Sequence, residues 1–168
     1  ISKYYLKQYE EAIKDFNKAI EIDPEDFRSW NFRGSCKYFL EQYKEAISDF
    51  DEGIELKPKD SQSWNFRGMS KYFLEEYGEA IKDFYKAIKL DPGDSANWKF
   101  RGRSQIFQNQ YELAIKDLNK AIELDPSDST CWEFRGISKY FLKQYEEAIK
   151  DLDEAIELDP EDSTCWGF

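Results

Sequence analysis

The sequence contains no histidine, and it has few sulfur-containing residues, with three cysteines and one methionine among 168 residues. The absence of histidine excludes histidine general bases, histidine metal ligands and histidine pH switches. Cys36, Cys131 and Cys165 are too few and too scattered for a disulfide framework or a four-ligand zinc site. We therefore expect reduced, partly buried cysteines, no cofactor and no metal, and a reducing compartment such as the cytoplasm.

The sequence has fewer positive than negative residues: 24 Lys and Arg against 35 Asp and Glu, which gives a net charge of -11. Nucleic acids and anionic membranes attract cationic surfaces, so we expect neither as a partner. No apolar run approaches the roughly 20 residues of a membrane span. The chain starts at Ile1 without a charged-then-apolar leader, which suggests a piece of a longer protein.

Proline and tryptophan are scarce too, but both recur at a fixed interval of 34 residues. Residues 27–60 and 61–94 are identical at 21 of 34 positions, which excludes a chance resemblance. The prolines are Pro24, Pro58, Pro92, Pro126 and Pro160, and the tryptophans are Trp30, Trp64, Trp98, Trp132 and Trp166. Such a period indicates a repeat architecture.

Each repeat predicts two amphipathic helices, because its apolar residues recur at near-helical spacing in the first series and mainly at steps of three and four in the second. In one repeat these residues are Trp30, Gly34, Tyr38 and Leu40, followed by Tyr43, Ala46, Ile47, Phe50 and Ile54. Proline ends the preceding helix, and the Asp or Ser that follows it can cap the next one. The short turn around Glu41-Gln42 requires the two helices to run antiparallel. The fold class is therefore all-α.

Across its whole length the chain resembles the tetratricopeptide repeat family, through Trp30, Gly34, Tyr43, Ala46, Phe50 and Pro58 and their equivalents. The resemblance implies an α-solenoid of antiparallel helix pairs, stacked into a right-handed superhelix whose inner groove is lined mostly by first helices. We expect residues 1–168 to form a single array. Its parts are a partial repeat 1–26, full repeats 27–60, 61–94, 95–128 and 129–162, and the start of a further first helix at 163–168.

A recurrent arginine departs from the family pattern, which often has leucine just before the glycine. Two hypotheses explain it: a ladder that binds phosphate or carboxylate, or a structural pair with the recurrent aspartate of the second helix. We favour the structural pair, because both series share one period. The arginines are Arg33, Arg67, Arg101 and Arg135, and the aspartates are Asp49, Asp83, Asp117 and Asp151.

No motif points to catalysis, since the sequence has no Gly-rich phosphate loop, no nucleophile elbow and no clustered ligand set. Paired glutamates such as Glu10-Glu11 fit a solvated helix face. We expect a protein–protein interaction scaffold rather than an enzyme, with an extended or helical peptide segment of a partner bound in the concave groove. The alternatives are a self-assembling structural array or a regulatory repeat domain of a larger protein.

Helical geometry predicts a groove from one stripe of each first helix together with the variable positions beside it. The candidate partner-binding residues are Arg28, Asn31, Phe32, Ser35, Phe39, Gln62, Asn65, Phe66, Met69, Phe73, Lys99, Phe100, Arg103, Phe107, Glu133, Phe134, Ile137 and Phe141. The phenylalanines either pack between repeats or form an exposed aromatic channel. The four charged members sum to +2, which favours a partly acidic peptide with apolar anchors.

Two further expectations concern specificity and the chain ends. Relatives that clamp the acidic tail of heat-shock chaperones carry Asn, Lys or Arg at sites that are Phe32, Phe66, Phe100 and Phe134 here, so we expect no binding of that tail. The C-terminal residues match the opening of a first helix, and uncovered apolar faces favour head-to-tail stacking of copies, with Trp166 and Phe168 near Ile1–Tyr9. The alternative is that both ends belong to a longer array.

Overall fold

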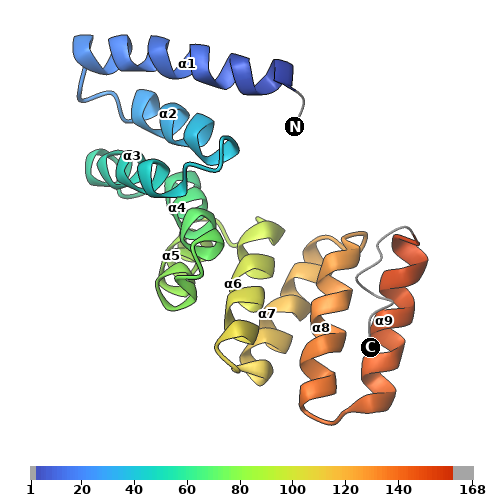
Figure 1. The fold of residues 1–168 in the computed structure, drawn as a ribbon. Helices are drawn as coiled ribbons and strands as arrows, with labels where there is room; N and C mark the ends of the chain where they lie inside the picture. The colour runs from blue at the N-terminus through green and yellow to red at the C-terminus, as the bar shows by residue number, and fades with distance from the viewer. Residues whose placement is uncertain (1–2, 161–168) are drawn as a thin grey trace. The chain divides into compact units, whose positions relative to one another are not determined.

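The computed structural model describes residues 3–160, and Figure 1 shows this part of the chain as a series of helices with no strand. The prediction of an all-α helical repeat solenoid is confirmed. None of the helices in the described range is both long and apolar enough to cross a membrane. The helices are α1 (Lys3–Ile22), α2 (Phe27–Phe39), α3 (Tyr43–Leu56), α4 (Ser61–Phe73), α5 (Tyr77–Leu90), α6 (Ser95–Phe107), α7 (Tyr111–Leu124), α8 (Ser129–Phe141) and α9 (Tyr145–Leu158).

The helices divide into two compact units, α1–α5 and α6–α9. In the first unit α2 pairs with α3 and α4 with α5, while α1 packs on α2 and α3 on α4. In the second unit α6 pairs with α7 and α8 with α9, and α7 packs on α8. We call α2, α4, α6 and α8 the first helices and the others the second helices. Neighbouring first helices within one unit, α2 with α4 and α6 with α8, also touch.

An aspartate caps the N-terminus of every first helix, as the sequence predicted. The side chain of Asp60 accepts a hydrogen bond from the Ser63 amide, and that of Asp128 accepts one from the Thr130 amide. The tryptophan of each repeat adds a contact that the sequence did not reveal, since its indole N–H donates to the carbonyl of the preceding proline. One example is Trp64 to Pro58, at 2.9 Å. Cap and indole together fix the loop between repeats.

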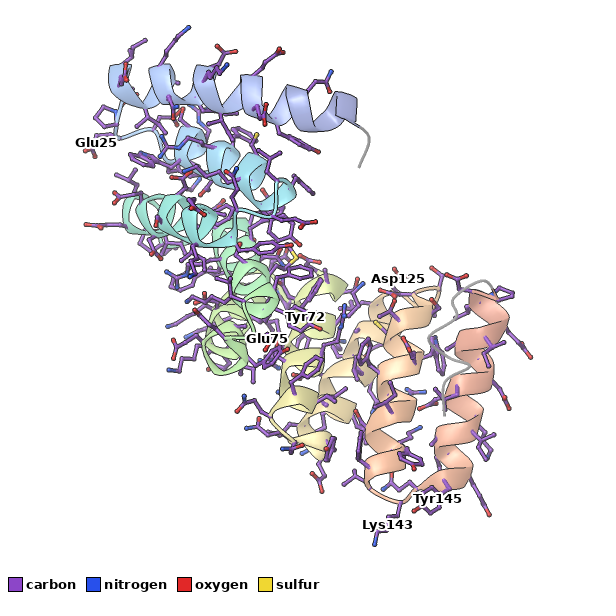
Figure 2. All side chains as sticks on the ribbon, in the orientation of Figure 1. Glu25, Tyr72, Glu75, Asp125, Lys143 and Tyr145 are labelled. Atoms are coloured by element: carbon purple, nitrogen blue, oxygen red, sulfur yellow. The ribbon has the colours of Figure 1, made fainter. Side chains whose placement is uncertain are left out.

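The turn inside each repeat contains a residue in the left-handed region of the Ramachandran plot. This residue is not glycine in any of the four turns, and its φ lies between 57° and 63°. Figure 2 shows two of these residues, Glu75 in the turn between α4 and α5 and Lys143 in the turn between α8 and α9. The other two are Glu41 and Asn109. The short turn confirms that the paired helices are antiparallel.

Glycine and alanine bring the two helices of a repeat into close contact. A Cβ atom on Gly68 would lie 2.9 Å from a ring carbon of Phe84, and one on Gly102 would lie 2.9 Å from Cγ of Leu118. Ala80 on the facing helix is completely buried. The expectation that the recurrent glycine permits a close approach is confirmed.

The recurrent arginine and aspartate form a bidentate pair in all four repeats, so the structural hypothesis is confirmed. In the first of them Arg33 donates from Nε and Nη2 to the two oxygens of Asp49, at 2.9 and 2.6 Å. Lys37 adds a third bond to Asp49 at 2.7 Å, and Arg33 lies over the Trp30 ring. The other pairs are Arg67–Asp83, Arg101–Asp117 and Arg135–Asp151.

The same arginine also bonds to the preceding second helix. Arg67 reaches Asp51 at 2.6 Å in addition to Asp83. Burial lowers the pKa of Arg67, but its hydrogen bonds and charge interactions with the two aspartates more than offset this, so the net pKa is raised. Each arginine with such a partner therefore holds three helices together, and it is not free to bind a ligand.

Candidate functional site

The eighteen candidate residues lie on the first helices, and we call them the first-helix surface. Five of its phenylalanines keep between 38% and 56% of their area exposed: Phe32, Phe39, Phe73, Phe107 and Phe141. Arg28 and Gln62 are also exposed. Three candidates, Asn65, Met69 and Glu133, are buried with at most 9% exposed, and the others are half-buried. Within each unit, the surface thus has partly exposed rings between buried or half-buried polar groups.

The sequence left open whether the phenylalanines pack between repeats or are exposed. In the structure they do both, because one face of the ring packs on the neighbouring repeat while part of the ring stays exposed. Phe73 stacks on Tyr43 of the preceding second helix with 5.1 Å between ring centroids, and Phe141 stacks on Tyr111 at 4.8 Å. Phe66 stacks on Phe50 at 5.8 Å. Such stacking contributes about 0.5–1.5 kcal/mol beyond area burial. The rings are therefore held rigidly at the surface.

Two polar residues of the surface bond to the capping aspartate of the next first helix. Asn31 on α2 donates from Nδ2 to Ser63 Oγ at 2.6 Å and to Asp60 Oδ2 at 3.2 Å. At the equivalent place in the second unit, Lys99 on α6 forms an ion pair with Asp128 at 2.6 Å. These positions couple adjacent repeats, a role that the sequence analysis assigned to ligand binding.

The surplus of positive charge expected from the sequence is neutralised within the chain. Lys99 is paired with Asp128, and Arg28 pairs with Asp26 through Nε at 2.8 Å. Burial raises the pKa of Asp128, but the Lys99 hydrogen bond and charge outweigh it and leave the pKa lowered. For Asp26 the hydrogen bond from Arg28 is the largest cause of a lowered pKa. Because Arg28 and Lys99 are paired within the chain, the charge of the candidate residues no longer favours an acidic peptide as the ligand.

A pocket of about 180 Å³ opens between α2 and α4. Its aromatic lining comes from Phe27, Phe32, Phe50 and Phe66, and its polar lining from Arg28, Asn31, Ser35, Asp60, Gln62 and Ser63. Four of these residues, Phe27, Phe50, Asp60 and Ser63, were not among the sequence-based candidates. The spacing between Asn31 and Asp60 recurs between Lys99 and Asp128, a signal that could have identified the aspartate.

The two cysteines in the described range lie in the interior and are free thiols. Burial, with a contribution from the Asp128 charge, raises the pKa of Cys131 to about 12, and burial also raises the pKa of Cys36. Both groups are therefore protonated and unreactive at neutral pH. Within residues 3–160 no group of three or more Cys, Asp or Glu residues is arranged to hold a metal ion. Cys165 lies outside the described residues, as do Trp166 and Phe168 of the expected head-to-tail contact.

Comparison with protein families shows a match along almost the entire chain. Models of the tetratricopeptide repeat match residues 2–26 and 61–94, residues 27–60 and 100–128, and residues 129–162. No match to the sequence was found among curated proteins.

Solved structures with the same fold share little sequence with this chain. MamA from Desulfovibrio magneticus RS-1 (residues 41 to the end) superposes with a TM-score of 0.85 at 19% identity, covering 92% of this chain and 87% of that one. YrrB, described as a TPR protein with an unusual peptide-binding site, gives 0.84 at 21% identity, covering 95% and 82%. The first TPR of Spaghetti (RPAP3), bound to the HSP90 peptide SRMEEVD, gives 0.61 at 24% identity, covering 63% and 84%. At these identities the similarity establishes the fold alone.

Proposed function

Because the chain belongs to the tetratricopeptide repeat family, we propose that it is a protein–protein interaction scaffold whose first-helix surface binds an extended or helical peptide segment of a partner protein. The observation that carries the proposal is that the first helices of each unit bear partly exposed phenylalanines, of which Phe32 is the most exposed at 56%. Exposed apolar area that is rimmed by polar residues typically marks an interaction surface. Because stacking fixes these rings before a ligand arrives, little side-chain entropy is lost on binding.

The similar structures support this proposal in general terms. YrrB is described as having a peptide-binding site, and the RPAP3 domain is bound to a peptide. Those are properties of those two proteins, and the present chain shares with them a fold that offers the same kind of surface. We propose that residues 1–168 act as one array and not as an enzyme, because the recurrent charged side chains hold helices together. The partner is a protein or peptide rather than nucleic acid or a membrane, and the buried free thiols fit a reducing compartment such as the cytoplasm.

A selection experiment tests the proposed function. A peptide-display library is selected against the chain, and the binding of enriched peptides is measured for Phe32→Ala and Tyr85→Ala. Both side chains are 56% exposed, but Phe32 lies on a first helix and Tyr85 on second helix α5. We expect Phe32→Ala to weaken binding by about ten-fold, or roughly 1.4 kcal/mol, and Tyr85→Ala to leave it unchanged.

The opposite pattern, in which Tyr85→Ala abolishes binding and Phe32→Ala does not, would place the ligand on the second helices and refute the proposal. Selection that yields no binding peptide, together with association that rises with protein concentration in sedimentation, would favour the self-assembling array instead. Circular dichroism on both variants shows whether a loss of binding reflects a loss of folding.

A further inference from the structure

The two pairs of neighbouring first helices share one architecture but differ in several groove residues, and two of these differences bear on the binding of a cation. Positions in α2 and α4 correspond to positions in α6 and α8 that are 68 residues later in the chain. The rings Phe32 and Phe66 thus correspond to Phe100 and Phe134, and Asp60 corresponds to Asp128. Two differences matter here: the first unit has Ser35 where the second has Arg103, and Asn31 where the second has Lys99.

In the second unit, cationic side chains of the chain itself contact these rings. The guanidinium carbon of Arg103 lies 4.5 Å from the Phe134 ring centroid and 5.3 Å from that of Phe100. The ammonium of Lys99 lies 5.7 Å from the Phe100 centroid and 2.6 Å from the Asp128 carboxylate. At this place the two phenylalanines hold the guanidinium of Arg103, and the capping aspartate pairs with a second cation, Lys99.

In the first unit the equivalent side chains are shorter, and the pocket between α2 and α4 is open. Ser35 is too short to reach between Phe32 and Phe66, and its hydroxyl donates to the Asn31 carbonyl at 2.9 Å. The Asn31 amide turns toward Gly53, where a Cβ atom would collide with its oxygen. Asn31 and Ser63 donate to Oδ2 of Asp60. Asp60 lines the pocket, and these bonds use its Oδ2 and not its Oδ1.

We propose that the pocket between α2 and α4 binds the guanidinium group of an arginine side chain from the partner segment. This inference rests on the proposed function of the first-helix surface and names the chemistry that it recognises. The guanidinium lies between Phe32 and Phe66, as Arg103 lies between their counterparts, and donates to Oδ1 of Asp60. Planar, weakly hydrated guanidinium suits both the stacking on rings and the bond to a carboxylate.

Size and charge agree with this occupant. A pocket of about 180 Å³ holds one side chain, whereas sites for whole small molecules span about 300–1,000 Å³. The net charge of -11 attracts a basic segment over long range. Two cations lie close by: Arg28 lines the pocket but is paired with Asp26, and Lys57 lies over Phe27 with its ammonium 4.3 Å from the ring centroid. Neither of them is placed on Asp60.

The test uses two small probes of nearly the same shape, N-acetyl-arginine amide and N-acetyl-citrulline amide, whose ureido group is uncharged and has a carbonyl oxygen in place of one guanidinium nitrogen. Backbone amide shifts of the complete chain are followed by NMR as each probe is added. We expect the arginine probe to shift the amides of Phe32, Ser35 and Gln62 in a saturable manner. The citrulline probe should bind at least about ten-fold more weakly, because it lacks the charge.

Matched variants locate the site. Ser35→Arg reproduces the side chain of Arg103 and should abolish the shifts, whereas Ser48→Arg adds the same charge on exposed α3 and should preserve them. Asp60→Asn retains a capping side chain and should weaken binding by at least about five-fold. It provides a second test should Ser35→Arg fail to fold.

Equal binding of both probes, or equal binding by Ser35→Arg and Ser48→Arg, would overturn the inference. Peptides selected on the first-helix surface are tested in parallel with each arginine replaced by citrulline. If those peptides still bind at Phe32 without loss, the proposed function stands and the arginine pocket does not. If they bind elsewhere on the chain, both proposals fall.

Discussion

Each turn inside a repeat places one residue in a conformation that suits glycine. Glu75 adopts a φ of 63° and Asn109 a φ of 57°. Left-handed backbone costs an ordinary residue about 1 kcal/mol, whereas asparagine and glycine tolerate it better. The sequence indicated a turn here but not its conformation, because glutamate and lysine are not typical of left-handed positions. The short connection between two antiparallel helices imposes the conformation on whatever residue is present.

Replacing Glu75 by glycine should therefore stabilise the chain. We expect Glu75→Gly to raise the free energy of unfolding by about 0.5–1 kcal/mol, after allowing for the greater entropy of glycine in the unfolded state. Asn109→Gly is the matched control and should change the stability much less. Chemical denaturation followed by circular dichroism measures both. Destabilisation by Glu75→Gly would show that the glutamate side chain contributes more than the backbone strain costs.

The positive charge of Arg28 at the rim of the pocket provides a second test at the residue scale. This side chain is 69% exposed and paired with Asp26. Because like charges repel, Arg28→Gln should strengthen binding of the arginine probe by about two- to five-fold, and more at low salt than at high salt. Lys44→Gln removes a charge from exposed α3 and serves as the control. Weaker binding by Arg28→Gln would mean that Arg28 itself contacts the ligand.

The two helices of a repeat pack closely at the recurrent glycine, whereas glycine elsewhere has no such contact. Replacing glycine by a larger residue should therefore have opposite effects on stability at the two kinds of position. A Cβ atom on Gly68 would meet Phe84 at 2.9 Å, whereas Gly78, in the first turn of α5, has no neighbouring atom within 4 Å of its Cβ position among the described residues. Gly68→Leu should lower the free energy of unfolding by about 1–3 kcal/mol through overpacking.

Gly78→Leu is the control, and it should stabilise by about 0.5–1 kcal/mol because leucine favours a helix more than glycine does. Thermal and chemical unfolding of both variants provide the comparison. An unchanged melt for Gly68→Leu would mean that α4 and α5 can separate without cost.

The helical elements were largely predictable from the sequence, because 34-residue periodicity and proline positions are local signals. The Arg33–Asp49 pair was predictable for the same reason, since both members recur with the period. The pocket was not, because it depends on how far Ser35 and Asn31 extend toward the next first helix. Sequence analysis assigned Asp60 only a capping role, whereas in the structure this residue also lines the pocket. Whether a groove position leaves a pocket depends on how far its side chain reaches toward the next first helix, and the 34-residue period does not give that distance.

At the scale of the whole molecule, the equivalence of repeats predicts that a second pocket can be created. The double variant Lys99→Asn, Arg103→Ser gives the α6–α8 pair the equivalents of Asn31 and Ser35. We expect it to bind two equivalents of the arginine probe, with new shifts at Phe100 and Phe134. A stoichiometry that stays at one, in a variant with unchanged circular dichroism, would show that removing these two side chains is not sufficient to create a second arginine pocket.

The distribution of charge over the molecule also predicts which ligands are rejected. A net charge of -11 repels acidic peptides, and the cations of the first-helix surface are engaged, with Lys99 bonded to Asp128 and Arg28 to Asp26. From the family resemblance we also expect Phe32, Phe66, Phe100 and Phe134 to occupy the sites where a carboxylate clamp needs donors. We therefore expect no saturable binding of an arginine-free peptide ending in Glu-Glu-Val-Asp up to about 100 μM, which corresponds to less than roughly 5.5 kcal/mol of binding free energy.

The first TPR of RPAP3, which is bound to SRMEEVD in its structure, is the positive control for that titration. The titration is followed by calorimetry, first at low salt. Screening is weakest there, so repulsion between the acidic peptide and the negatively charged chain is strongest. Raising the salt concentration should then leave the acidic peptide unbound, since screening removes the repulsion but supplies no donor. Micromolar affinity at any salt concentration would show that the first-helix surface has cationic groups to offer, and it would contradict the arginine pocket as the main determinant of specificity.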